Sequence, residues 1–208
     1  MQKVLGIAWL AVLAPLAMAA QEARDLPVFK SINSQGVYSL VVTAGQPQQS
    51  VLVSGDDEAL AKLSTKVVGD ELIISMPDTG HTKWKNELTI TIGVTHLGKL
   101  QSDGVGSTKL NQLHDDEFVL QYKGVGSVTA NGKVQRLVLR AEGVGSIDAR
   151  ELQAQSVDAR LQGVGSARVR ASESLNAKVE GVGSLTYYGN PKHVSKSADG
   201  IGSVRAAR

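Results

Sequence analysis

Gly104-Val105-Gly106-Ser107 is the first of six nearly identical motifs in this chain. The same four residues recur at 124–127, 143–146, 163–166 and 181–184, and Gly200-Ile201-Gly202-Ser203 ends the series. Successive first glycines are 20, 19, 20, 18 and 19 residues apart. A fixed period near 20 residues is typical of stacked structural repeats. The motif therefore predicts coils that all turn the same corner.

The residues around each motif alternate between apolar and polar. Apolar residues predominate at four positions counted from the first glycine of each motif: two, four and six residues before it and four residues after it. In the repeat that begins at Gly143 these are Ala141, Leu139, Leu137 and Ile147. Such alternation predicts strands with one buried face. Strands that recur without helices between them stack as rungs about 4.8 Å apart. We therefore expect an all-β fold, a parallel β-solenoid of about six rungs of 19–20 residues.

The motif itself is predicted to be a structural corner. Its glycines allow either a positive φ or a close approach of stacked corners. We expect the central valine or isoleucine to pack inside the corner, where full burial contributes about 2 kcal/mol each. The repeated serines (Ser107, Ser127, Ser146, Ser166, Ser184 and Ser203) are expected to form a hydroxyl ladder. The corner glycines are Gly104, Gly106, Gly124, Gly126, Gly143, Gly145, Gly163, Gly165, Gly181, Gly183, Gly200 and Gly202.

The N-terminus has the pattern of a secretory signal peptide. A basic start with Lys3 precedes an apolar run, Val4–Ala17, and Ala17-Met18-Ala19 fits a small-residue cleavage site. The run is shorter than the roughly 20 residues that span a bilayer. We expect residues 1–19 to be removed and the mature protein to be exported to the periplasm or the extracellular space, with no membrane span. Residues 20–27 are predicted to be a linker.

The segment 28–96 lacks the motif, yet it continues the alternation of strands and turns in the same domain as the repeats, 97–208. Strand-like runs lie at Tyr38–Thr43, Ser50–Val53, Leu72–Ser75 and Leu88–Ile92. One short helix is predicted at Asp57–Leu63.

These features together resemble a known family. Phe29-x-x-Ile32, the strand near Tyr38–Thr43, the helix at 57–63, the turn and strand Gly69–Ile74 and the repeated Gly-x-Gly corners are similar to the putative autotransporter adhesin head domain, or GIN domain. The resemblance runs from Phe29 to the C-terminus. It implies an exported bacterial β-helical domain with a role at the cell envelope, and it implies no activity for particular residues.

Composition narrows the function classes. Loss of Lys3 with the signal peptide leaves a net charge of +1, which argues against nucleic acid as a partner. The chain has no cysteine, so disulfides and thiolate metal sites are excluded. The motif lacks the third glycine of a dinucleotide fingerprint and the Gly-Lys of a P-loop. His81, His96, His114 and His193 share no metal-ligand spacing, and no catalytic residue, metal site or cofactor is predicted.

One surface pattern suggests binding. Arg140, Arg160 and Lys178 are expected to stack on successive rungs beside Glu142, Gln162 and Glu180. The pattern fits either a solvated, mutually neutralising face or a flat groove for an anionic or hydroxyl-rich polymer. The few aromatic candidates for sugar stacking are Trp84, Tyr187 and Tyr188. Tyr187 falls at an inward position, so Tyr188 is the exposed ring that we add to the candidate binding residues; core packing or loop anchoring is the alternative for all three.

We therefore predict a non-enzymatic exported module that binds an envelope glycan or protein, or has a structural role. The alternative is a small polysaccharide-active enzyme, because other parallel β-helices cleave acidic polysaccharides. The sixth rung is expected to leave the backbone N–H and C=O groups of its outer edge unpaired, which favours end-to-end association of copies. Lys196, Asp199 and Arg205 are expected to act as charged guards against it.

Overall fold

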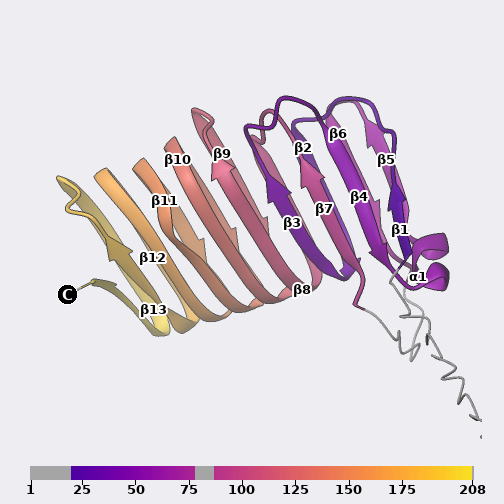
Figure 1. Ribbon diagram of the computed structural model, residues 1–208. Helices are drawn as coiled ribbons and strands as arrows, with labels where there is room; N and C mark the ends of the chain where they lie inside the picture. Colours follow the sequence, from indigo (N-terminus) through magenta and orange to yellow (C-terminus); the bar gives the residue numbers. More distant parts are fainter. Residues whose placement is uncertain (1–19, 78–86, 208) are drawn as a thin grey trace, which may run out of the picture.

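The structure, a computed structural model, describes residues 20–77 and 87–207 and is a nearly all-β parallel solenoid of about five turns (Figure 1). The predicted signal peptide, His81 and Trp84 lie outside the described residues. The described strands are β1 (Ala20–Ala23), β2 (Ser31–Val37), β3 (Ser39–Thr43), β4 (Ser50–Gly55), β5 (Ser64–Val68), β6 (Glu71–Ser75), β7 (Thr89–Gly93), β8 (Lys99–Leu113), β9 (Glu117–Tyr122), β10 (Val125–Ala141), β11 (Val144–Leu161), β12 (Val164–Tyr188) and β13 (His193–Ala206). The predicted solenoid is confirmed.

Each rung has two arms that meet at a glycine motif. We call the strand segment before the motif the first arm and the segment after it the second arm. In the first arm, Leu139 pairs in parallel with Ala159, which pairs with Ala177. In the second arm, Ser127 pairs with Ser146, which pairs with Ser166. Equivalent residues of successive repeats therefore form straight columns along the solenoid.

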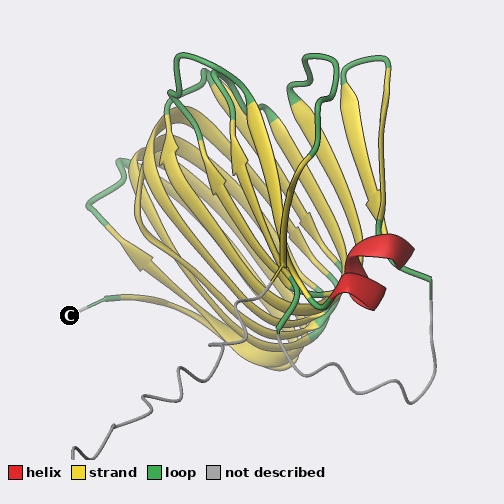
Figure 2. Cartoon of the chain, turned by 45° about the vertical axis from the view of Figure 1, so that its right-hand side comes forward, coloured by secondary structure: helices red, strands yellow, loops and turns green. Residues whose placement is uncertain are grey.

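The N-terminal part extends the same column. Both β2 and β3 pair in parallel with β8, so that they form the rung before it, and Gly36 and Val37 occupy the corner opposite Gly104 and Val105. Beyond them lie β6 and β7, followed by the antiparallel strands β5, β4 and β1. Helix α1 (Asp57–Lys62) matches the predicted helix and buries Ala59 and Leu60 at this end, where it is the one red element in Figure 2.

The core fills the space between the arms. The predicted inward positions are buried on the first arm at Leu137 and Leu139 and on the second arm at Ile147, each with at most 4% of its surface exposed. A single cluster of buried apolar residues runs from Phe29 to Leu185. Burial of these columns supplies the main stabilisation of a chain that has no cysteine.

The corner differs from its prediction. The central valines lie outside: Val105, Val125, Val144, Val164 and Val182 expose between 48% and 51% of their surface. The prediction that they pack inside the corner is wrong, because strand alternation gives the inward positions to the two glycines on either side of each valine.

Both proposed roles of the glycines hold at the corner of β11. A Cβ on Gly143 would lie 2.0 Å from the carbonyl oxygen of Gly124 on the preceding rung. A Cβ on Gly145 would lie 1.9 Å from the carbonyl oxygen of Gly126, and Gly145 also has a φ of +151°. Close stacking of the corners therefore excludes a side chain, and the backbone conformation disfavours one as well.

The last rung is covered on one side only. β13 pairs with β12 in register, but its inward positions Val194, Lys196 and Ala198 are exposed. These side chains face the same way as the core residues of the other rungs, but no described strand lies beyond β13 to cover them. An inward-pointing charged residue on an edge strand, such as Lys196, discourages another strand from pairing with that edge.

Candidate functional site

The predicted cationic column on the first arm is formed. Arg140 of β10 pairs with Arg160 of β11, and Arg160 pairs with Lys178 of β12, in one continuous register. The three side chains therefore stack on successive rungs as expected. Their role in binding stays a prediction.

Most of this column is neutralised within the protein. The guanidinium of Arg140 makes a paired contact with the Asp158 carboxylate, at 2.9 Å from Nη2 to Oδ2 and 3.3 Å from Nη1 to Oδ1. Lys178 Nζ lies 2.5 Å from Glu180 Oε1. This hydrogen bond, together with one from Gln162, lowers the pKa of Glu180, and the contact with Glu180 raises the pKa of Lys178.

Two further members of the predicted face differ from one another, because Glu142 is paired and Arg160 has no ion pair within the described residues. Glu142 pairs with Lys123 at 3.3 Å. Arg160 is exposed. A shallow groove of about 610 Å³ opens beside the column toward the last rung, and Arg136, Asp158, Asn176 and Lys192 contribute its polar lining. Two of the three stacked cations are therefore paired with carboxylates of the same face, an arrangement that fits a largely neutralised, solvated sheet face.

A second polar surface lies on the second arm, and sequence reasoning missed it. We call Asp148, Arg150, Arg168, Arg170 and Tyr188 the arginine surface. Arg150 Nη2 lies 2.7 Å and Arg168 Nη1 3.7 Å from the same oxygen of Asp148. Burial works to raise the pKa of Asp148, but the hydrogen bonds from Arg150 and the charges of Arg150 and Arg168 outweigh it and lower that pKa.

The third arginine of this surface has no carboxylate partner in the described part of the chain. Arg170 Nε donates to the carbonyl oxygen of Arg150 at 2.8 Å, and its guanidinium lies 5.8 Å from the centre of the Tyr188 ring. The arginine surface therefore has one carboxylate for three guanidinium groups, and that carboxylate contacts two of them. The side chains of Arg150 and Arg168 expose 44% and 45% of their surface, so their outer N–H groups are accessible to a ligand.

A groove of about 520 Å³ adjoins the arginine surface. Its polar lining includes Lys133, Gln153, Arg170 and Asn190. The signal for this site was present in the sequence, because Asp148-Ala149-Arg150 and Arg168-Val169-Arg170 occupy equivalent positions after successive motifs. The prediction for the aromatics holds in part: Tyr187 packs against the core, whereas Tyr188 is half-buried beside Arg170.

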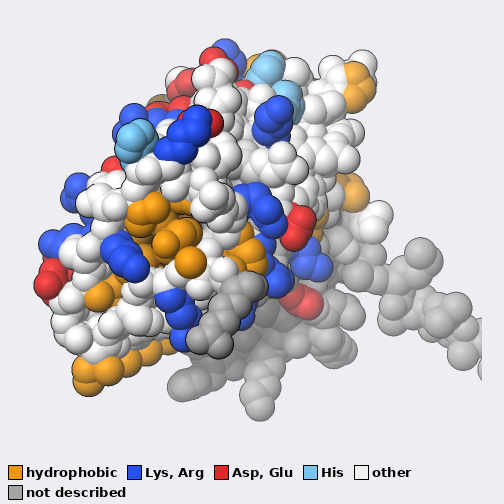
Figure 3. All heavy atoms as spheres, turned by 90° about the vertical axis from the view of Figure 1, so that its left-hand side faces the viewer, with side chains coloured by type: hydrophobic (Ala, Val, Ile, Leu, Met, Phe, Trp, Pro, Cys, Tyr) orange, Lys and Arg blue, Asp and Glu red, His pale blue; other side chains and the backbone are white. Residues whose placement is uncertain are grey.

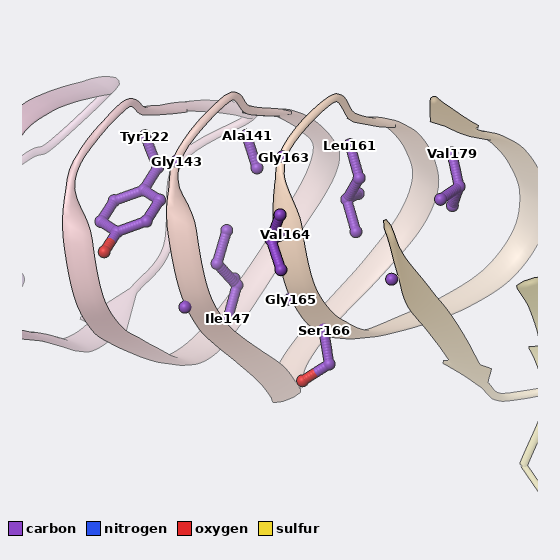
Figure 4. Close-up of a pocket in the computed structure, with 12 residues that line it drawn as sticks. Tyr122, Ala141, Gly143, Ile147, Leu161, Gly163, Val164, Gly165, Ser166 and Val179 are labelled. Carbon is purple, nitrogen blue, oxygen red and sulfur yellow. The ribbon is translucent and has the colours of Figure 1, made fainter. Parts of the chain in front are cut away.

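The interior of the corners leaves no room for a ligand. A cavity of about 20 Å³ lies behind Gly143 and Gly163, between the row of Tyr122, Ala141, Leu161 and Val179 and the side chain of Ile147 (Figure 4). This volume suits at most one water molecule. The glycine motifs therefore shape the fold and cradle no phosphate group.

The other candidate groups form local contacts. Ser39 Oγ and Ser107 Oγ lie 2.8 Å apart at the start of the serine column. His96 Nδ1 lies 2.8 Å from Asp115 Oδ1, and the rings of His96 and His114 are 5.3 Å apart. Within residues 20–77 and 87–207, no group of three histidine or acidic side chains has a metal-binding arrangement.

Comparison with known proteins decides the family. The family model of the putative auto-transporter adhesin, head GIN domain, matches residues 28–191. The chain belongs to this family. No curated protein matches the sequence. In the described part of this GIN domain, no helix is long and apolar enough to cross a membrane.

Solved structures share the fold over nearly the whole chain. A putative adhesin from Bacteroides fragilis is 26% identical, with a TM-score of 0.75 over 93% of this chain and 99% of that one. A putative adhesin from Parabacteroides distasonis is 16% identical, with a TM-score of 0.57 over 91% and 97% of the two chains. A putative lipid binding protein from the same species is 19% identical, with a TM-score of 0.51 over 93% and 98%. The last two likenesses show the fold alone.

Proposed function

We propose that this GIN domain is an exported, non-enzymatic binding module of the cell envelope whose arginine surface recognises an extended anionic polymer. The observation that carries the proposal is the sharing of Asp148 by Arg150 and Arg168, with Arg170 lying beside them. Membership of an adhesin family supports binding rather than catalysis.

The geometry suits a polymer more than a small ligand. Arg150 lies on one rung and Arg168 and Arg170 lie on the next, so guanidinium groups of two adjacent rungs are close together along the solenoid axis. Rungs are spaced about 4.8 Å apart, so a chain laid along this arm would place successive anionic groups against the guanidinium groups of these two rungs. Arginine is suited to this role because its planar fork donates two parallel hydrogen bonds to a carboxylate, sulfate or phosphate group.

The first arm is the weaker candidate. Arg140 and Lys178 each have a carboxylate of their own, Asp158 and Glu180, which an anionic ligand would have to displace. On the second arm three arginines have only Asp148 between them, so fewer donors are already occupied. The predicted alternative of a polysaccharide-active enzyme requires a base beside the sugar. We assign that role to no residue.

The test measures binding of the mature chain to a uronate polymer, alginate, and to neutral dextran as a control, by isothermal titration calorimetry. The triple variant R150Q/R168Q/R170Q is expected to lose at least tenfold in affinity for alginate. The matched variant R136Q/R160Q/K192Q removes the same charge from the first arm and is expected to bind like the wild type. Binding of the wild type should weaken as salt increases.

Equal losses in both variants, or no binding of alginate by the wild type, would refute the arginine surface as the site. New reducing ends or unsaturated products in the incubated polymer would favour the enzyme instead.

A further inference from the structure

The exposed residues of the corners form a continuous apolar ridge, which we call the spine. Each of its members is β-branched and exposes between 48% and 80% of its surface. In order along the solenoid, the spine consists of Val37, Val105, Val125, Val144, Val164, Val182 and Ile201. In the end-on view of Figure 3, hydrophobic side chains line the lower edge, where the corners lie.

The backbone register makes the spine straight. Val105 pairs with Val37 on one side and with Val125 on the other, and Val144 pairs with both Val125 and Val164. Val182 N–H donates to the carbonyl oxygen of Gly163 at 3.3 Å, and Val182 pairs with Ile201. Seven side chains at about 4.8 Å intervals give a ridge roughly 29 Å long.

The spine is large for a soluble surface. Its side chains together expose on the order of 500 Å² of apolar area, which matches the largest apolar patch on an ordinary monomer. From Val105 to Val182 both neighbours of each valine are glycines, so no adjacent side chain on the same rung shields it. A protein that faced only water would gain from a polar residue at these positions.

The two flanks of the spine differ in charge. One flank is the serine column, which begins with Ser39 and Ser107 and carries only hydroxyl groups. The other flank consists of Asp103, Lys123, Glu142, Gln162, Glu180 and Asp199, with four carboxylates to one cation. Lys123 pairs with Glu142, and Lys178 of the adjacent column pairs with Glu180. A partner that covers the spine must therefore offer hydrogen-bond donors opposite the acidic flank and avoid placing carboxylates there.

We propose that the spine is the interface with a second copy of this chain, in which the two spines lie back to back, parallel and in register. A two-fold axis parallel to the spine places the serine column of each copy opposite the acidic flank of the other, where hydroxyl groups donate to carboxylates. A two-fold axis across the spine would instead place acidic flank against acidic flank. Charge complementarity thus selects the parallel arrangement.

The buried area defines what kind of dimer forms. Two spines together bury about 1,000 Å², which is at the low end of specific interfaces. The dimer is therefore concentration-dependent, and its arginine surfaces stay exposed on the second arms.

The absence of native cysteines allows a clean test, because single cysteines can be cross-linked with a short bismaleimide. The variants V105C, V144C and V182C are each expected to cross-link with themselves, since every spine residue faces its own copy. In an antiparallel dimer V105C would face V182C, about 19 Å from its own equivalent. Q153C on the second arm is the matched control and is expected to stay monomeric.

Sedimentation velocity over a range of concentrations provides the second measurement. The wild type is expected to shift from monomer to dimer, whereas V144K/V164K is expected to remain monomeric with an unchanged circular dichroism spectrum. Cross-linking of V144C alone would overturn the parallel arrangement. A wild type that is monomeric throughout would overturn the dimer, and flotation of that monomer with anionic lipid vesicles would assign the spine to a membrane surface.

Discussion

The substitution Gly145→Ala tests the structure of the corner most sharply. The new Cβ would lie 1.9 Å from the carbonyl oxygen of Gly126, and alanine would have to adopt a φ of +151°. A non-glycine residue in such a conformation costs about 1–3 kcal/mol. To relieve the contact the two rungs must separate, which weakens ladder hydrogen bonds worth about 1 kcal/mol each. We expect the free energy of unfolding to fall by about 3–4 kcal/mol.

Urea denaturation followed by circular dichroism measures this loss, and Val144→Ala is the matched control on the adjacent residue. Because half of Val144 is exposed, removing its methyl groups should cost only about 0.8 kcal/mol. A Gly145→Ala variant that loses less than a Val144→Ala variant would refute the reasoning, because it would mean that the valine, and not the glycine, faces the crowded side.

Four further predictions concern single side chains. The Tyr122 hydroxyl is buried and has no hydrogen-bond partner in the described part of the chain, so Tyr122→Phe should be neutral or stabilise by up to about 1 kcal/mol in thermal unfolding. Tyr38→Phe should cost about 1–2 kcal/mol, because the Tyr38 hydroxyl makes a buried 2.7 Å hydrogen bond to a serine; equal effects of the two changes would contradict this. Lys178→Gln removes the cation that lowers the pKa of Glu180, so an NMR titration should show this pKa rising toward its ordinary value. In the wild type the pair stabilises the fold above that ordinary value, and the stabilisation is lost as pH falls through the lowered pKa. An unchanged Glu180 pKa would show that the contact does not form in solution. Lys196→Leu should promote association through the outer edge of β13, seen as earlier elution in gel filtration, and unchanged elution would remove Lys196 as a guard.

Much of the fold could be predicted from the sequence because two periods are superimposed. The repeat of about 20 residues identified the rungs. The two-residue alternation of apolar and polar side chains identified inward positions such as Leu139 and Ile147. The same alternation places Val144 outside, since it lies one residue from the inward Gly143 and Gly145. The prediction failed there because the apolar character of valine was given more weight than its register.

The candidate site was harder to predict because ion pairing depends on contacts between rungs. The register of Arg140, Arg160 and Lys178 followed from the period. The neutralisation of Arg140 by Asp158 did not, because Asp158 lies two positions away on the next rung. The arginine surface was missed because its column after the motif changes residue type from rung to rung, from Thr129 to Asp148 to Arg168.

Protection of arginines from modification by phenylglyoxal, measured by mass spectrometry with and without bound alginate, tests the proposed function most directly. Arg150, Arg168 and Arg170 are expected to become protected when the polymer binds, while Arg136 and Arg160 on the first arm react at the same rate as in the free protein. Protection of Arg136 and Arg160, with Arg150, Arg168 and Arg170 unaffected, would contradict the assignment of binding to the second arm.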